Sequence, residues 1–165
     1  MKLAPLVPDR AMLLFDKLQA VRASSVTNEQ LKRQDFARTF YASVYDSGFD
    51  KLRLISKKAW VKRAKSGKAQ CYDHINRPQL VGEWLYDHPE AMANFYDFLT
   101  IYRKCRFVIE VTSKENIALK VPDHTPYSYK EASIDLLRIG DTFRWVKQRD
   151  VTPTDNDLTP YFVNM

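Results

Sequence analysis

Apolar side chains recur at near-helical spacing through the first 65 residues. One series follows Pro8-Asp9, a typical helix start, and comprises Met12, Leu13, Phe15, Leu18 and Val21. A second follows the capping-box pattern Thr27-x-x-Gln30 and stops before Gly48; its members are Leu31, Phe36, Phe40, Tyr41 and Val44. A third helix is expected from Asp50 to about Ala64, with an apolar stripe of Leu52, Ile55, Ala59 and Trp60.

The pattern changes after Ser66-Gly67, which is a turn signal. The segment from Lys68 to Ile75 is a candidate short strand. Asp87-x-x-Glu90, with Pro89 in the first turn, predicts a helix from Pro89 to about Arg103. Its expected buried side comprises Ala91, Met92, Phe95, Phe98, Leu99 and Tyr102.

The clearest strand runs from Arg106 to Val111, because β-branched residues are frequent there. Thr112-x-x-Glu115 then caps a short helix that Pro122 ends. Ser128-x-x-Glu131 is a further capping signal, followed by Ile134, Leu137, Ile139 and a stop at Gly140. Residues 142–146 fit a strand or a helix equally, and the polar tail after residue 151 is expected to pack loosely.

These patterns predict an α+β fold in which a mostly helical N-terminal part precedes a β-containing core. The expected organisation is a helical region over 1–65, a core over 66–150 and a tail over 151–165, together forming one compact domain. The length of 165 residues suits a domain of common size with a substantial core.

Composition narrows the class of protein. No apolar run approaches the roughly 18 residues of a membrane span, and the first residues do not resemble a secretory signal. Cys71 and Cys105 lie far apart without a CxxC pair, so neither a disulfide framework nor a cysteine zinc cluster is expected. A cytoplasmic, soluble protein is the expectation.

The net charge of +6 is concentrated in one segment. No Asp or Glu occurs from Lys51 to Tyr72, and the segment from Lys51 to Lys68 contains eight basic residues: Lys51, Arg53, Lys57, Lys58, Lys62, Arg63, Lys65 and Lys68. The remainder holds 18 basic against 20 acidic residues. A solvated helix face and a polyanion-binding surface explain such a segment about equally well.

Three histidines are candidates for chemistry. His88 follows Asp87 at an expected helix start, where a structural role is favoured. His74 follows Asp73 at the end of a predicted strand, and His124 follows Asp123 beyond the helix that contains Asn116. Imidazole titrates near pH ~6.5 and suits a general base, while carboxylate and amide oxygens suit a Mg²⁺-like ion.

Asp73-His74, then a strand, then Glu115-Asn116-x-x-Leu119 with His124 behind it, resembles the ββα-metal (His-Me finger) core of HNH-type endonucleases, particularly phage-associated members. The resemblance covers roughly residues 66 to 126. It implies a ββα-metal unit with a helix inserted between its strands, because 42 positions separate His74 from Asn116.

The resemblance assigns roles to four residues. It implies that His74 is the general base, that Asp73 is a ligand of Mg²⁺ or another divalent cation, and that Asn116 is a ligand or orients His74. His124 is a second possible ligand. The implied reaction is hydrolysis of DNA phosphodiester bonds, in the cytoplasm of a phage host.

Nucleic-acid contacts are expected mainly from the basic segment. The candidates are Lys57, Lys58, Lys62, Arg63, Lys65 and Lys68, with Arg77 and Arg106 as possible phosphate contacts. Tyr72, Trp60 and Trp84 can stack on bases, although core positions are favoured for them. DNA is the expected partner, with RNA as the alternative nucleic acid.

Two alternatives to an endonuclease remain at this stage. One is a non-catalytic nucleic-acid-binding or phage accessory protein that uses residues 51–68. The other is a small protein-interaction domain whose basic surface faces an acidic protein. Salt-sensitive nucleic-acid binding without metal distinguishes the first alternative, and failure to bind nucleic acid favours the second.

Overall fold

The computed structural model describes residues 8–68, 70–119, 128–139, 152–153 and 158–165. The chain divides into two compact units. The first is made of residues 1–50, 76–106 and 163–165, and the second of residues 51–75 and 107–162. The fold class is α+β, as the sequence predicts.

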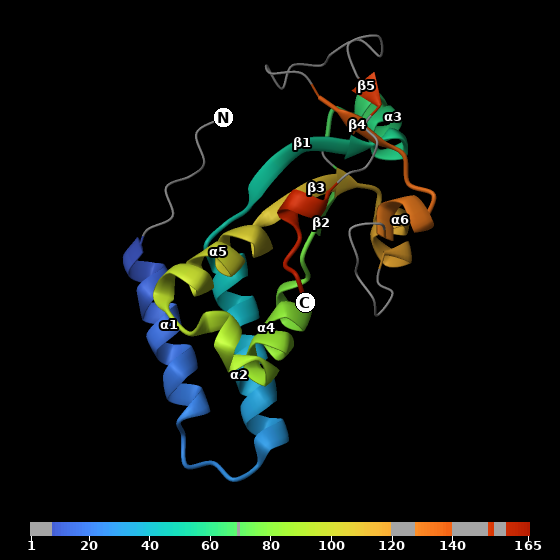
Figure 1. Ribbon diagram of the computed structural model, residues 1–165. Coiled ribbons are helices and arrows are strands. Elements are labelled where there is room, and N and C mark those ends of the chain that lie inside the picture. The colour runs from blue at the N-terminus through green and yellow to red at the C-terminus, as the bar shows by residue number, and fades with distance from the viewer. Residues whose placement is uncertain (1–7, 69, 120–127, 140–151, 154–157) are drawn as a thin grey trace. The chain divides into compact units, whose positions relative to one another are not determined.

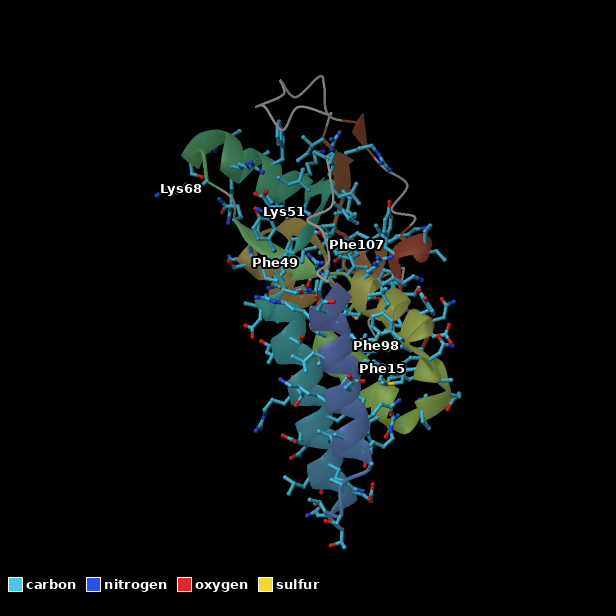
Figure 2. All side chains as sticks on the ribbon, turned by 90° about the vertical axis from the view of Figure 1, so that its left-hand side faces the viewer. Phe15, Phe49, Lys51, Lys68, Phe98 and Phe107 are labelled. Atoms are coloured by element: carbon cyan, nitrogen blue, oxygen red, sulfur yellow. The ribbon has the colours of Figure 1, made fainter. Side chains whose placement is uncertain are left out.

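The first unit is helical (Figure 1). Its elements are α1 (Pro8–Arg22), α2 (Glu29–Asp46), α4 (Pro78–Asp87), the 3-10 helix η1 (Pro89–Met92) and α5 (Phe95–Cys105). Phe15 of α1 packs on Phe98 of α5 with ring centroids 5.4 Å apart (Figure 2). Phe36, Phe40 and Val44 of α2 are fully buried in the same core, which confirms part of the predicted apolar series.

Helices α2 and α4 approach each other closely at Gly82. A Cβ atom added there would lie 2.9 Å from Cα of Ala37, closer than two carbon atoms tolerate. Glycine at this position therefore allows the backbones of the two helices to meet.

Several predictions for the first unit need correction. Helix α2 is capped by Asn28, whose side chain accepts a hydrogen bond from the backbone N–H of Leu31, instead of by the Thr27 capping box. Met12 and Leu13 are 42% and 56% exposed, because the buried stripe of α1 runs through Ala11, Leu14 and Leu18.

The predicted helix over 89–103 is also wrong at its start. Asp87 ends α4, and Asn94 caps α5 by accepting hydrogen bonds from the N–H groups of Tyr96 and Asp97. Asn94 lies later in the chain and provides a better cap geometry than the Asp87-x-x-Glu90 pattern.

The second unit is built on a sheet with strand order β2-β3-β1-β4-β5 (Figure 1). The strands are β1 (Asp50–Ser56), β2 (Cys71–His74), β3 (Phe107–Val111), β4 (Leu136–Arg138) and β5 (Thr152–Pro153). The β2–β3, β1–β4 and β4–β5 ladders are antiparallel. The helices are α3 (Lys57–Ser66), α6 (Ser113–Ala118), α7 (Ser128–Glu131) and the 3-10 helix η3 (Thr159–Tyr161).

The third predicted helix is half wrong. Residues 50–56 form β1, and only residues 57–66 are helical. Leu54 packs in one hydrophobic cluster and Ile55 in another, as the alternation of a strand requires. Ser56 then caps α3, since its Oγ accepts the N–H of Ala59 at 3.0 Å.

The predictions for the C-terminal part are confirmed in some segments and wrong in others. The strand over 106–111 and the capping box at Thr112 are confirmed. A helical continuation through Ile134 and Leu137 is wrong, because α7 ends at Glu131 and residues 136–138 form β4. The tail is better packed than expected, since its buried residues include Leu158, Phe162 and Val163. Residues 142–146 and Pro122 lie outside the described residues.

Candidate functional site

Strands β2 and β3 with helix α6 form a continuous strand–strand–helix arrangement. Asp73 pairs with Ile109 and His74 with Val108 in the antiparallel ladder, and α6 follows β3 after a single residue. Helix α6 packs against β2. The Asn116 side chain donates a hydrogen bond from Nδ2 to Sγ of Cys71 at 3.3 Å. The succession of two strands and a helix agrees with the sequence, but α4, η1 and α5 all lie between the strands in the chain, where a single inserted helix was predicted.

Asp73 and His74 do not share a face of the sheet. Successive side chains of a strand point to opposite faces, so Asp73 lies on the face of Cys71 and α6, while His74 lies on the face of Tyr72. Both residues are buried, at 5% and 7% exposure. The Tyr129 hydroxyl of α7 donates a hydrogen bond to Oδ2 of Asp73.

Asp73 and His74 do not converge on one metal ion, because their side chains point to opposite faces of the sheet. One carboxylate oxygen of Asp73 already accepts a hydrogen bond from Tyr129, and the Asn116 amide is oriented by Cys71. Within the described ranges, no group of three or more His, Cys, Asp or Glu residues is placed to hold a metal ion. His124, the second predicted ligand, lies outside those ranges.

Glu115 joins the start of α3 to the start of α6. Its Oε2 accepts three hydrogen bonds: from Oγ of Ser56 at 2.6 Å, from the backbone N–H of Thr112 at 2.8 Å and from Oγ1 of Thr112 at 2.9 Å. Ser56 and Thr112 are the N-caps of the two helices, and Glu115 is only 5% exposed. One buried carboxylate thus fixes both helix starts.

A groove of about 610 Å³ lies beside these two helix starts, and we call it the lysine groove. Four lysines line it, three from the first turns of α3 and one from α6: Lys57, Lys58, Lys62 and Lys114. Its other lining residues are Val61, Thr112, Glu115, Ala118, Ala132 and Ile134. Four cations and one carboxylate, already bonded to the caps, give the groove a positive character.

The lysines of the groove are available to a ligand. Lys57, Lys58 and Lys62 are exposed, and the part of the chain that the structure describes contains no ion pair between these lysines or Lys114 and a carboxylate. Lys65 and Lys68 are also exposed but do not line the groove. Five of the six contacts predicted in the basic segment are therefore exposed. Lys57, Lys58, Lys62 and Lys65 lie on α3, and Lys68 lies beyond its end.

The arginine candidates have other contacts. Nη1 of Arg63 lies 2.6 Å from Oε2 of Glu110, a carboxylate that is 5% exposed. Arg106 is 3% exposed and belongs to the first unit, where it donates to the carbonyl oxygens of Gly48 and Ser47. Arg77 is half-buried at the start of α4.

Arg106 also pairs with Asp50 at 3.4 Å. Burial raises the pKa of the Asp50 carboxyl, and the opposite charge of Arg106 limits that rise. This buried pair and the two carbonyl contacts give Arg106 a structural role at the end of α2.

The remaining predicted aromatic and histidine candidates are also explained by packing. Trp60 is buried beside Ile55 and Ala59. Lys51 lies over the ring of Tyr72, 4.3 Å from its centroid, and donates to its hydroxyl at 2.9 Å. His88 stacks on Trp84 with ring centroids 5.0 Å apart, which agrees with its structural interpretation.

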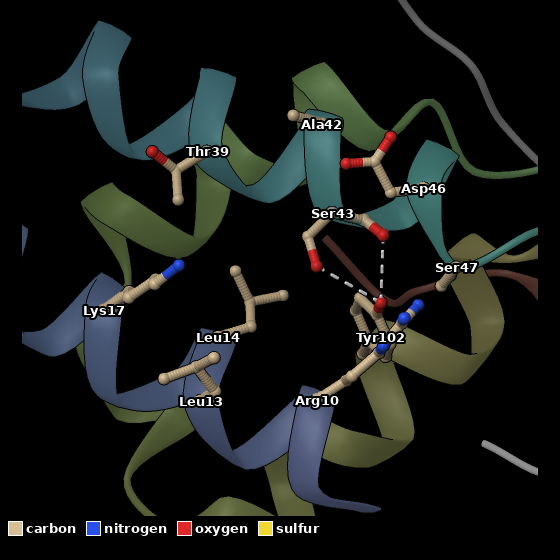
Figure 3. Close-up of a pocket in the computed structure, with 10 residues that line it drawn as sticks. All are labelled: Arg10, Leu13, Leu14, Lys17, Thr39, Ala42, Ser43, Asp46, Ser47 and Tyr102. Atoms are coloured by element: carbon tan, nitrogen blue, oxygen red, sulfur yellow. Dashed lines mark hydrogen bonds between the residues drawn. The ribbon is translucent and has the colours of Figure 1, made fainter. Parts of the chain in front are cut away.

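The first unit has a groove of its own, of about 570 Å³, between α1, α2 and α5 (Figure 3). Figure 3 shows Tyr102 reaching from α5 to Ser43 of α2. Its hydroxyl donates to the Ser43 carbonyl oxygen at 3.1 Å. Arg10 and Lys17 of α1 and Asp46 of α2 line the same groove, so its charges are mixed.

Sequence reasoning found α3 but missed Lys114 and Glu115 as site residues. The Thr112-x-x-Glu115 pattern was sufficient to predict a helix cap, and a cap explains Glu115 without a ligand. The sequence shows that Lys114 lies inside the capping box, between Thr112 and Glu115. It does not show that Lys114 lies beside α3, because this follows from the tertiary contact between Ser56 and Glu115.

Comparisons of the chain with protein-family models, with curated proteins and with solved structures find no match. Among the described residues, no helix is both long enough and apolar enough to cross a membrane. Any function therefore has to be argued from the geometry of the site.

Proposed function

We propose that the second unit binds the sugar–phosphate backbone of a nucleic acid in the lysine groove. The observation that carries this proposal is the convergence of four lysines from two helices on one concave surface. Lys57 and Lys114 lie 57 positions apart in the sequence, so their proximity is a product of the fold.

A merely solvated helix face accounts less well for this arrangement. Solvated lysines spread around the exposed side of their own helix, whereas these side chains line a groove together with apolar Val61 and Ile134. Among the described residues that line the groove, the one carboxylate is that of Glu115, which is bonded to helix caps and lies within ion-pair distance of none of the described lysines. The arrangement favours a ligand that carries several negative charges.

Nucleic acid is the polyanion that fits the charge distribution of the whole chain. The segment 51–68 is strongly basic on a nearly balanced background, which localises attraction to one surface. Phosphates repeat along a nucleic-acid strand, so several lysines can contact one ligand simultaneously.

The test is binding of fluorescently labelled single-stranded and duplex DNA, measured by anisotropy at 50 mM salt. Replacing Lys57, Lys62 and Lys114 by glutamine should remove most of the binding. Lys130, an exposed lysine of α7 in the same unit, provides the control, and Lys130→Gln should bind as wild type does. Equal binding by the triple variant and the wild type would refute the assignment to the groove.

A second candidate function is DNA cleavage by the strand–strand–helix arrangement of β2, β3 and α6. The hydrogen bond between Asn116 and Cys71 favours it, because it holds α6 against the strand that carries Asp73 and His74. The placement of Asp73 and His74 on opposite faces of the sheet makes it the weaker candidate.

A plasmid-nicking assay with Mg²⁺ or with EDTA separates the two candidates. Metal-dependent cleavage that is lost in His74→Ala supports an endonuclease. DNA binding that needs no metal and survives His74→Ala, without cleavage, supports a binding protein. Absence of both binding and cleavage would favour a protein-interaction domain.

A further inference from the structure

Two hollows lie along the hairpin that α1 and α2 form in the first unit (Figure 1). One is the groove of about 570 Å³ in Figure 3, and the other, of about 500 Å³, lies at the end of α1 and the start of α2. Residues three and four positions apart share one side of a helix. The lining residues on the α1 side have this spacing and include Arg10, Leu13, Lys17, Ala20 and Ser24.

The α2 side of the two hollows has the same spacing. Its lining residues include Asp35, Thr39, Ala42 and Asp46, which also share one side of their helix. Because α1 and α2 run in opposite directions, the two hollows follow one another along a single face of the hairpin (Figure 1). We call this face, lined by both sets of residues, the hairpin groove.

The hairpin groove combines an apolar projection with a depression. Leu13 projects from α1, and 56% of its surface is exposed. On α2, the short side chains of Thr39, Ala42 and Ser43 line the same hollow as Leu13 (Figure 3). Burial of an exposed leucine is favourable, so a partner gains by covering Leu13 and by filling the depression with a side chain of similar size.

The charges of the hairpin groove are sorted by helix. Arg10 and Lys17 on α1 are positive, whereas Asp35 and Asp46 on α2 are negative. All four side chains are exposed, and none of them forms an ion pair with another residue that the structure describes. Lys32, which also lines the groove, pairs with Glu29 at 2.7 Å and leaves the sorting intact.

We propose that the hairpin groove binds the hairpin groove of a second copy of this chain, so that α1 of each copy lies antiparallel against α2 of the other. A two-fold axis parallel to the helices produces this pairing, because it keeps each level of the hairpin opposite itself and exchanges α1 with α2. The inference goes beyond the proposed function, since the lysine groove belongs to the second unit.

The pairing matches the groove residue by residue. Arg10 faces Asp46 of the second copy, because both residues line the same hollow. Leu13 enters the depression on α2 of the second copy. Lys17, at the level of Thr39, lies about one helical turn from Asp35 of the second copy. Each contact occurs twice by symmetry, so four charges without ion pairs and two exposed leucines are satisfied together.

A second copy fits the charges better than an unrelated helix does. A helix of one charge sign would meet like charge on one side of the groove, whereas a second copy meets opposite charge on both sides. A two-fold axis across the helices is disfavoured, because it would place Lys17 of one copy against Lys17 of the other.

The size of the face sets the strength of the dimer. The 15 residues of α1 span about 22 Å, and two adjacent helices are roughly 20 Å wide. Two such faces cover about 900 Å² in projection, close to the roughly 1,000 Å² that a specific interface needs. A weak dimer is therefore expected, with a Kd on the order of 10 µM.

Analytical ultracentrifugation of the full chain from about 1 to 300 µM tests the pairing. Wild type should change from monomer to dimer over this range, and Leu13→Glu should weaken the dimer at least about tenfold. Met12→Glu is the matched control, because Met12 is 42% exposed and does not line the groove. A wild type that stays monomeric would overturn the inference, as would equal effects of the two variants.

A mixing experiment tests which helices meet. In Arg10→Glu/Lys17→Glu both helices present negative charge to the groove, and in Asp35→Lys/Asp46→Lys both present positive charge. Each variant alone should dimerise at least about tenfold more weakly than wild type, because like charges then face each other. An equimolar mixture should recover a heterodimer of about wild-type affinity. Variants that dimerise as wild type does, or a mixture that stays monomeric, would overturn the inference.

Discussion

Removal of the Glu115 carboxylate tests whether this side chain holds the starts of α3 and α6. In Glu115→Ala, the Ser56 hydroxyl and the Thr112 N–H and hydroxyl lose their common acceptor. An N-cap contributes about 1 kcal/mol, and a hydrogen bond to a charged group about 1.5 to 3 kcal/mol. Because the three bonds share one oxygen and are not additive, we expect a loss of about 3 kcal/mol.

Native-state hydrogen exchange measures this loss where it occurs. A loss of about 3 kcal/mol corresponds to roughly 150-fold faster exchange of the protected amides in peptides that cover 56–66 and 112–119. Glu115→Gln keeps an acceptor and should lose about 1 kcal/mol. Glu131→Ala, at an exposed glutamate of α7, is the control and should leave exchange unchanged.

The result that would refute the reasoning is specific. If exchange in both peptides of Glu115→Ala accelerates less than about twofold, the two caps are independent of the carboxylate. If only the peptide over 112–119 accelerates, the contact between Ser56 and Glu115 does not join the helices.

Three further predictions concern contacts outside the groove. Arg63→Met should lower the stability of the second unit by about 3 kcal/mol in urea denaturation, because it leaves the buried Glu110 carboxylate without its ion pair. An unchanged urea midpoint would show that solvent compensates the charge of Glu110. Gly82→Ala should cost about 2 kcal/mol through overpacking of α2 against α4, and wild-type thermal stability would contradict the close approach. The hydrogen bond to Glu29 raises the pKa of Tyr86 to about 12, so its contribution to stability should be present below about pH 10 and lost as the pH rises through 12. Ultraviolet titration should show one tyrosine that ionises near pH 12, and Glu29→Gln should lower the pKa of Tyr86.

The sequence was informative where local signals and tertiary packing agree. The capping box at Thr112 and the β-branched strand before it are both present in the structure. In α1 the periodicity was right and Phe15, Leu18 and Val21 face the core. Met12 and Leu13 do not, because Leu13 and Leu14 fit helical spacing about equally well. Only packing against α2 and α5 buries Leu14 and leaves Leu13 exposed.

The error at 50–56 has a similar cause. Leu52, Ile55 and Ala59 lie three and four positions apart, as in a helix, while Leu52 and Leu54 also alternate, as in a strand. A seven-residue segment is too short for periodicity to decide, and pairing with β4 determines the outcome. No local signal in these residues reports that distant pairing.

The candidate site was predictable in its charge and not in its shape. The basic segment is visible in the sequence, and most of its lysines are exposed in the structure. Lys114 joins them only because Glu115 reaches Ser56 across the fold. The strand–strand–helix order was also predictable, and Asp73 and His74, as neighbours in one strand, point to opposite faces of the sheet in any register.

The salt dependence of DNA binding tests the central claim most directly. If all four lysines of the groove neutralise phosphates of single-stranded DNA, the logarithm of the binding constant should fall with that of the salt concentration with a slope of about −2.8. Wild type should then lose roughly 50-fold in affinity between 50 and 200 mM salt, whereas the variant without Lys57, Lys62 and Lys114 should lose only about threefold. A common slope for the two proteins would contradict the account, because the cations that contact the phosphates would then lie elsewhere.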